Sequence, residues 1–263
     1  MFENVIKLYD TLRANGENIC PVAHTYISAH IGILIDMDGN FICALPAQNQ
    51  ELIPVPCTVK SACRTGGVAP HLLHDNLSYV AGIGKYKERY PMYIEQLEKY
   101  TQIVKDEYAE AILKYVKKGF LMEDAKEAIQ QLPDTMPLEK RNVIFCVYGM
   151  DIEGVDLKWS EYYPATLPKN GLCAITGQYD YIPPSYPGYV LSPSDNDKLF
   201  LKGSGVGYMA SEKIIHALQY MVYGKTNATR VELNYNFQRV LNGDLSEAVF
   251  LQWLKEKYNI SVK

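Results

Sequence analysis

The residues best suited to binding chemistry gather between Lys60 and Lys85. Lys60 and Arg64 stand just upstream of the pair Gly66-Gly67. Two successive glycines can take positive φ without a steric penalty and expose neighbouring backbone N–H groups. With cations beside it, such a loop is suited to hold an anion such as a phosphate group. The alternative is a glycine-rich turn that only joins a strand to a helix, and the local pattern leaves both open.

A second polar pair, Asp75-Asn76, follows the loop and precedes an apolar run. Asn76 is either a helix cap or an amide that reads a base edge in a nucleic acid. Asp75 is expected to be structural, because a carboxylate repels phosphate. The candidate nucleic-acid-binding residues are therefore Lys60, Arg64, Thr65, Gly66, Gly67, Asn76 and Lys85.

Catalytic patterns are sparse in this chain. His71 and His74 form a His-x-x-His pair with Asp75 beside it, but no third ligand stands at a recognisable spacing, so we predict neither a metal site nor another cofactor. There is no Gly-x-Ser-x-Gly nucleophile elbow. We therefore expect a binding protein and not an enzyme.

The six cysteines are scattered, and the nearest two, Cys57 and Cys63, lie six positions apart. This spacing favours reduced, structural thiols in a cytoplasmic protein. The N-terminus lacks a signal-peptide pattern, and no apolar run reaches the length needed to span a bilayer, so we expect no membrane partner.

Charge is uneven along the sequence. The chain carries a net charge of −4, yet residues 57–90 hold five basic and two acidic side chains. A protein that grips a duplex mainly through phosphates is normally strongly basic. Any contact with nucleic acid is therefore expected to be a local patch, supported by other subunits.

The elements that must position these residues follow an α+β pattern, with an antiparallel hairpin or sheet and a helical lobe. Residues 26–35 and 41–45 are rich in strand formers and flank the turn signal Asp36–Asn40, which predicts a β-hairpin. Leu52–Val59 contains two prolines and predicts an edge strand, and Asn142–Tyr148 predicts a buried strand.

Helical periodicity predicts the remaining elements. The predicted helices cover the N-terminal residues up to Asn15, then 90–118, 122–132, 211–222 and 245–258. We expect residues 151–178 to be rich in loops, and short strands at 198–201 and 229–235. The expected organisation is a single domain over 1–263 with a helical insertion at about 86–132.

The order of these features resembles the N-terminal part of the large subunit of the type I-C CRISPR surveillance complex (Cascade). That family carries a signature of the form Arg-Thr-Ser-Gly-x-x-Pro-x-x-Leu-x-Asp-Asn-x-x-Tyr-x-x-Gly. Here it stands as Arg64-Thr65-Gly66-Gly67, Pro70, Leu73, Asp75-Asn76, Tyr79 and Gly82. Two shorter blocks, Leu172–Gly177 and Ala210–Glu212 with Ala217-Leu218, resemble later family motifs.

The resemblance implies a fold like the large subunit's N-terminal domain and a non-catalytic role in antiviral defence. Such a subunit would bind double-stranded DNA at the protospacer-adjacent motif (PAM), next to the crRNA and the other Cascade subunits. It implies that Lys60 and Arg64 contact phosphate, that Gly66-Gly67 support them, and that Asn76 contacts a base. The alternative is a truncated, possibly phage-encoded mimic of the large subunit. It would act as an anti-CRISPR protein that blocks complex assembly or DNA binding.

Overall fold

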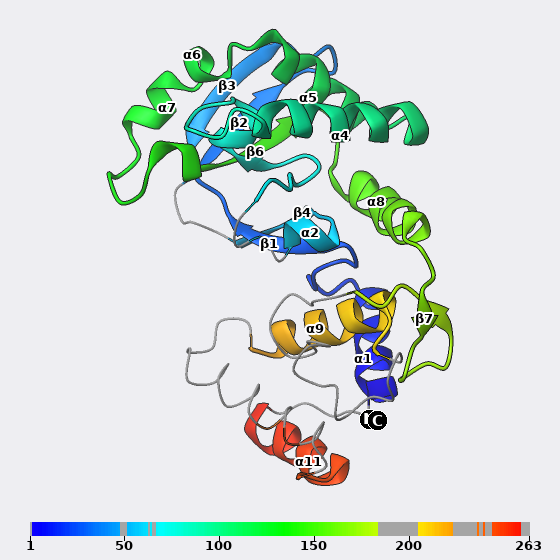
Figure 1. Cartoon of the computed structure of the whole chain (residues 1–263). Coiled ribbons are helices and arrows are strands. Elements are labelled where there is room, and N and C mark those ends of the chain that lie inside the picture. The colour runs from blue at the N-terminus through cyan, green and yellow to red at the C-terminus, as the bar shows by residue number, and fades with distance from the viewer. Residues whose placement is uncertain are drawn as a thin grey trace. The chain divides into compact units, whose positions relative to one another are not determined.

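The computed structural model describes residues 2–47, 52–62, 64, 67–183, 205–222, 236, 239 and 244–258. The chain divides into two compact units, one formed by residues 1–22 with 166–263 and the other by residues 23–165 (Figure 1). Both helices and strands are present, which confirms the predicted α+β class. Whether the units fold as one domain is not decided by this division, so the single-domain organisation stays a prediction.

A four-stranded mixed sheet forms the centre of the unit 23–165 (Figure 1). Its strands, in sheet order, are β3 (Phe41–Pro46), β2 (Ile31–Ile35), β6 (Asn142–Val147) and β5 (Asp75–Asn76). The β2–β3 hairpin is antiparallel, as predicted, but β2 and β6 pair in parallel. β6 is thus a central strand between β2 and the two-residue edge strand β5.

One face of this sheet is buried beneath helices. Ile31, Ile33 and Ile35 of β2 alternate with less buried residues, and their partners on β6 are Val143, Phe145 and Val147. These six side chains are at most 3% exposed and lie on the same face, because side chains alternate along a strand. Helix α5 (Glu107–Lys118) contacts both strands, and Tyr108 donates a hydrogen bond of 2.8 Å to the carbonyl of Phe145.

The predicted strand over 26–35 is in fact two strands. β1 (His24–Ser28) leaves the main sheet and pairs with β4 (Leu52–Pro56) in a separate antiparallel ribbon. The chain changes direction at His30. The backbone N–H of His30 donates to the Asn142 carbonyl, and its Nδ1 atom accepts a hydrogen bond from the Asn142 N–H. A run of β-formers predicts strand in both halves but not this change of partner.

The helical segment predicted at about 86–132 contains four helices. These are α4 (Arg89–Val104), α5, α6 (Leu121–Asp124) and α7 (Lys126–Gln130). The predicted helix over 90–118 is interrupted at Lys105, which has a left-handed backbone (φ 54°), and Asp106 then caps α5 by accepting a hydrogen bond from the Ala109 N–H. Two further short helices, α2 (Val59–Ala62) and α3 (Leu77–Val80), and the 3-10 helix η1 (Leu138–Lys140) lie outside this span.

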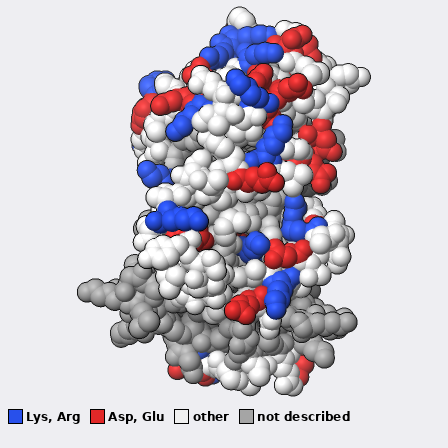
Figure 2. All heavy atoms as spheres, turned by 90° about the vertical axis from the view of Figure 1, so that its right-hand side faces the viewer, with Lys and Arg blue, Asp and Glu red and all other residues white. Residues whose placement is uncertain are grey.

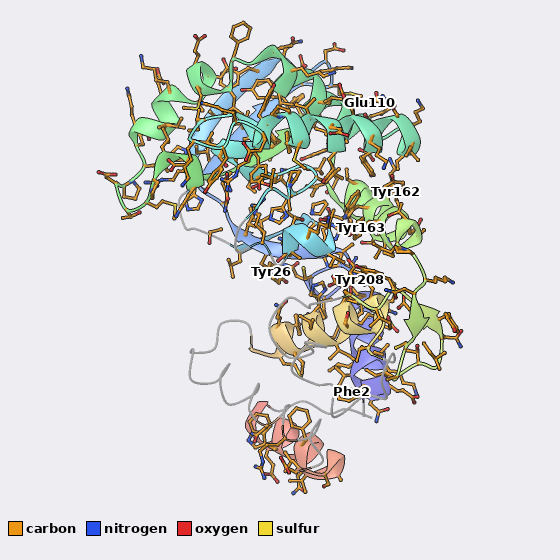
Figure 3. All side chains as sticks on the ribbon, in the orientation of Figure 1. Phe2, Tyr26, Glu110, Tyr162, Tyr163 and Tyr208 are labelled. Carbon is orange, nitrogen blue, oxygen red and sulfur yellow. The ribbon has the colours of Figure 1, made fainter. Side chains whose placement is uncertain are left out.

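The prediction that residues 151–178 are rich in loops is wrong in its first half, where α8 spans Glu153–Thr166. Its aromatic residues anchor it. The indole N–H of Trp159 donates to the carbonyls of Ala23 and Cys57, both at 3.1 Å. Tyr162 and Tyr163 project from α8 (Figure 3), and their ring centroids lie 5.8 Å and 5.1 Å from that of Trp159. The helix was hard to predict because only Val155 and Trp159 are buried along it and it contains a proline.

In the other unit, α1 (Phe2–Ala14) packs against α9 (Tyr208–Val222), and Lys213 pairs with Asp10 at 2.7 Å. A short ribbon, β7 (Gly171–Leu172) with β8 (Tyr179–Asp180), supplies the Asp180 carboxylate, which accepts a hydrogen bond from the Met209 N–H at the start of α9. Helix α11 (Glu247–Tyr258) matches the predicted final helix. The strands predicted at 198–201 and 229–235 lie outside the described residues.

Across the described ranges, no helix is both long and apolar enough to cross a membrane.

A substitution at Gly39 tests how closely the β2–β3 turn packs against α5. Its φ is +71°, and an added Cβ would lie 2.7 Å from both the Lys114 Cβ and the Tyr115 backbone nitrogen. We expect Gly39→Ala to lower the free energy of unfolding by about 2–4 kcal/mol, the sum of left-handed strain and overpacking. Urea unfolding at equilibrium measures this.

Gly149→Ala is the matched control for Gly39→Ala. Gly149 has φ +78° in the same unit, but nothing lies within 4 Å of its added Cβ. Gly149→Ala should therefore lower the free energy of unfolding only by the cost of a left-handed backbone in alanine, about 1–2 kcal/mol. Equal losses in the two variants would contradict the close packing of the turn on α5.

Candidate nucleic-acid interface

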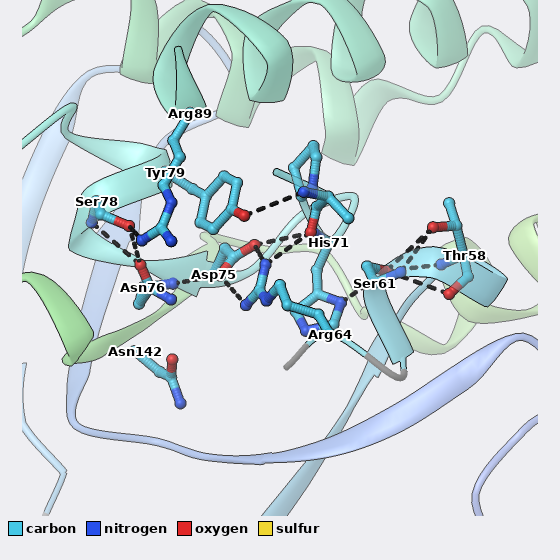
Figure 4. Close-up of polar contacts among 12 residues, drawn as sticks. Thr58, Ser61, Arg64, His71, Asp75, Asn76, Ser78, Tyr79, Arg89 and Asn142 are labelled. Carbon is cyan, nitrogen blue, oxygen red and sulfur yellow. Dashed lines mark hydrogen bonds and ion pairs between the residues drawn. The ribbon is translucent and has the colours of Figure 1, made fainter. Parts of the chain in front are cut away.

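The buried carboxylate of Asp75 organises the candidate site. Its side chain is 0% exposed and accepts two hydrogen bonds from Arg64, each 2.7 Å long. It also accepts from the backbone N–H groups of His71 at 2.9 Å and Asn76 at 2.7 Å. Asp75 is therefore structural, as expected, and it ties the glycine-rich loop to the edge strand β5 (Figure 4).

The guanidinium of Arg64 points at Asp75 (Figure 4). It also donates to the Ala69 carbonyl at 2.8 Å, and only 16% of the side chain is exposed. Burial acts to lower the pKa of Arg64, but the hydrogen bonds and charge of Asp75 outweigh it, so the pKa lies above its ordinary value. This geometry gives Arg64 a carboxylate partner inside the protein, where the sequence suggested a phosphate outside it.

Asn76 caps α3. Its side-chain oxygen accepts a hydrogen bond of 3.2 Å from the Ser78 N–H, which confirms the capping alternative. The same oxygen accepts from the Ser78 hydroxyl, which in turn accepts from Arg89 at 2.9 Å. The side-chain amide nitrogen of Asn76 makes no hydrogen bond within the described part of the chain, so the base-reading role stays a prediction.

The other candidate residues vary in position. Lys60 is exposed on α2, and Gly67 is exposed with φ +75° and open space around it. Lys85 is exposed, with its ammonium nitrogen 4.7 Å from the centre of the Tyr86 ring. Thr65 and Gly66 lie outside the described residues.

A chain of cation–aromatic contacts joins Arg64 to Lys85. The Arg64 guanidinium lies 4.5 Å from the Tyr79 ring centre, and Arg89 lies 5.1 Å from the same ring and 4.3 Å from the Tyr86 ring. We call Arg64, Tyr79, Arg89, Tyr86 and Lys85 the cation–aromatic ladder; part of it appears in Figure 4. The ladder contains two of the candidate residues, Arg64 and Lys85, and Asn76 is linked to it through the hydrogen bonds of Ser78 with Asn76 and Arg89.

The sequence-based candidate set missed Tyr79, Tyr86 and Arg89. A signal was present in the run Lys85-Tyr86-Lys87-Glu88-Arg89-Tyr90, where basic and aromatic residues interleave. That alternation is a feature of nucleic-acid-binding surfaces.

Helix α4 holds the loop beneath the ladder. Tyr93 donates a hydrogen bond of 2.8 Å to the Leu73 carbonyl, and Gln96 donates to the Pro70 carbonyl at 3.3 Å. Residues 70–75 are buried as a result. This attachment fixes the backbone that carries Asp75.

His71 and His74 are both held neutral inside the unit. Burial lowers the pKa of His71 to about 4 and that of His74 to about 3. His71 Nδ1 lies 3.0 Å from the Ser61 hydroxyl, and His74 Nδ1 accepts a hydrogen bond from the Phe145 N–H at 3.1 Å. Among the residues with described positions, no group of three or more His, Cys, Asp or Glu side chains is placed to hold a metal ion.

The surface carries mixed charge on the face drawn in Figure 2, where Lys and Arg are interspersed with Asp and Glu. This agrees with the acidic net charge of the whole sequence. Lys and Arg do not form a continuous cationic surface on this face.

The sequence matches the model of one known protein family. A family model described as CRISPR-associated protein (Cas_Csd1) matches residues 5–187, which is well over half of the sequence. The chain belongs to this family. No curated protein matches it. The matched range of this CRISPR-associated chain contains the whole network from Arg64 to Lys85.

Replacing Arg64 separates its structural role from phosphate binding. We expect Arg64→Met to lower the free energy of unfolding by about 3 kcal/mol, because the buried Asp75 carboxylate loses its counter-charge. Denaturant unfolding measures the loss. Lys60→Met is the control, since Lys60 is exposed and its replacement should change stability by at most about 0.5 kcal/mol. Unchanged stability in Arg64→Met would contradict the structural role.

The buried histidines predict acid sensitivity. Their folded-state pKa values lie below the unfolded value of about 6.5, so the unfolded chain binds more protons at mildly acidic pH. The contribution of these neutral histidines to the free energy of unfolding should be fully present above pH 6.5. It should be lost progressively as the pH falls towards their folded-state pKa values. Each histidine contributes about 1.4 kcal/mol per pH unit in that window.

His74→Asn tests this assignment, because the asparagine oxygen can replace Nδ1 as acceptor for the Phe145 N–H. Urea midpoints between pH 7 and pH 5 should show a shallower dependence in this variant than in the wild type. An identical dependence would mean that His74 does not contribute to it.

Proposed function

We propose that this chain is a non-catalytic subunit of a type I-C-like surveillance complex that binds duplex DNA beside the PAM. The observation that carries the proposal is the position of a cationic, aromatic segment within a range that matches a CRISPR-associated family. Lys60 and Lys85 are exposed there and make no ion pair with any described carboxylate. Phosphate contacts of this kind position a protein on DNA, whereas base-edge contacts give it specificity.

We propose a role for each residue of the site. Lys60 and Lys85 contact phosphates, because both ammonium groups reach solvent. Asn76 contacts a base edge through its amide nitrogen, since its oxygen is occupied by the cap. Arg64 holds Asp75 and so fixes the backbone that presents Asn76.

A non-catalytic role is supported by the burial of the serine and the two histidines that lie nearest the glycine-rich loop. Ser61, His71 and His74 are each at most 3% exposed. Ser61 is also engaged at the start of α2, where its hydroxyl accepts a hydrogen bond of 2.8 Å from the Thr58 N–H. A general base must come within hydrogen-bond reach of its substrate, and these side chains face the interior.

Asn76→Ser tests the base contact, because serine retains a capping oxygen but lacks the amide. In a complex reconstituted from this chain, the other type I-C subunits and a guide RNA, we expect the wild type to bind PAM-containing duplex more tightly than PAM-free duplex. Asn76→Ser should lose about 1–3 kcal/mol of that preference. Fluorescence anisotropy measures both, and thermal unfolding checks that the cap is preserved. A variant that keeps the full preference would remove Asn76 from PAM recognition.

A second candidate function is an assembly-blocking mimic of the large subunit. The net charge of −4 and the neutralisation of Arg64 by Asp75 favour it, because both reduce attraction to DNA. Expression in cells with an intact type I-C system separates the two. A working subunit restores interference to a strain without its large subunit, whereas a mimic abolishes interference in the complete strain and co-purifies with the remaining subunits.

A further inference from the structure

The cation–aromatic ladder runs from the interior to the surface. At its inner end, Tyr79 is 1% exposed and Arg64 is paired with the fully buried Asp75. Arg89 is half-buried, and Tyr86 at the outer end is 41% exposed. Each cation–aromatic contact lies within about 6 Å, the range in which the ring quadrupole attracts a cation. The outer side chains are therefore held against a buried framework.

The outer end has an excess of positive charge. Lys85, Lys87 and Arg89 stand at alternate positions of a five-residue stretch, and none of them forms an ion pair within the regions that the structure describes. Arg89 donates to the Ser78 hydroxyl, and its Nε atom is buried without a hydrogen-bond partner in those regions. The nearby carboxylates are Glu88, adjacent in sequence, and Glu139, whose side chain packs beside Gly84.

The loop that carries these cations is constrained. Gly82 and Gly84 have φ of +65° and +91°, and an added Cβ would lie 3.2 Å from the side chains of Tyr90 and Glu139 respectively. The backbone is therefore closely packed on both neighbours. Preorganisation of this kind lowers the entropy lost when a ligand binds.

Helix α4 adds to the positive potential at this point. It begins at Arg89, it has no acidic residue in its first turn, and Glu88 makes no side-chain cap. Helix N-termini carry a partial positive charge and favour anions. The carboxylate of the N-cap residue Glu88 offsets part of this positive charge, although it makes no capping hydrogen bond. The three basic residues outnumber it, and a bound anion would reduce the repulsion among them.

We infer that Lys85, Lys87 and Arg89, which we call the outer cation cluster, contact the phosphate backbone of duplex DNA. This inference rests on the proposed function and names the surface through which it acts. Lys85 and Lys87 bind phosphates directly. Arg89 is oriented by Tyr79, Tyr86 and Ser78, and Lys85 lies against the same Tyr86 ring, so two of the three cations are positioned by aromatic contacts. The contact is independent of sequence, in contrast to the base contact proposed for Asn76.

The test is a double substitution, Lys85→Gln with Lys87→Gln, in the reconstituted complex. The matched control is Lys99→Gln with Lys126→Gln, which removes two exposed lysines without ion pairs from other helical surfaces of the same unit. Affinity for a PAM-containing duplex is measured by anisotropy at several salt concentrations. Each lost phosphate contact makes the slope of log affinity against log salt shallower by about 0.9, so the expected change is about 2.

The possible outcomes separate this inference from the proposed function. A shallower slope with an unchanged ratio between PAM-containing and PAM-free duplex, and no change in the control, supports the inference. A wild-type slope in the Lys85–Lys87 variant, with PAM preference intact, overturns this inference together with the phosphate contact proposed for Lys85. PAM-dependent binding of duplex DNA by the chain then stands without them. If the wild-type complex binds neither duplex, both are overturned. A shallower slope with single-stranded DNA or RNA, but not with duplex, also overturns it.

Discussion

The ion pair between Arg64 and Asp75 is the interaction on which the candidate site depends. A carboxylate removed from water is costly unless it is paired and hydrogen-bonded, and Asp75 receives four donors. Those donors come from three parts of the chain: the residue before the glycine-rich turn, the backbone at His71 and the start of α3. One buried charge therefore closes the loop between residues 64 and 76.

This pair also explains how a rather acidic protein presents cations in order. Arg64 is neutralised by Asp75, yet its guanidinium still lies over the Tyr79 ring, whose neighbour on the other side of the network is Arg89. Tyr79 additionally accepts a hydrogen bond from the Ala69 N–H at 3.1 Å. The aromatic ring is thus fixed by the loop and in turn fixes Arg89. The buried ion pair thus restrains the conformation of residues nearer the surface through cation–aromatic contacts, without a further carboxylate.

Much of the fold could be predicted from the sequence because local patterns agree with it. The turn at Asp36–Asn40 has its own hydrogen bonds, since the Asp36 carboxylate accepts from the backbone of Asp38 and Asn40. These local bonds favour a hairpin at this position. The division between β1 and β2 could not be predicted, because it depends on His30 meeting Asn142, which lies 112 residues away. Helix α8 escaped prediction for a similar reason: Trp159 and Tyr163 are anchored by distant backbone groups and not by an apolar stripe.

The candidate site shows the same limit. Residue types and spacing identified the stretch from Lys60 to Lys85 but could not reveal that Asp75 is the partner of Arg64, because a carboxylate eleven positions away is only one of several acids in reach of a long side chain. Once that pairing is known, the available positive charge shifts from Arg64 towards Lys85, Lys87 and Arg89. Electrostatic attraction between exposed groups decays over about 8 Å at physiological salt, so the potential near these residues is set by their neighbours and not by the net charge of −4. A locally cationic surface on an acidic chain is what the proposed DNA binding requires, and the proposal assigns the remaining affinity to the other subunits of the complex.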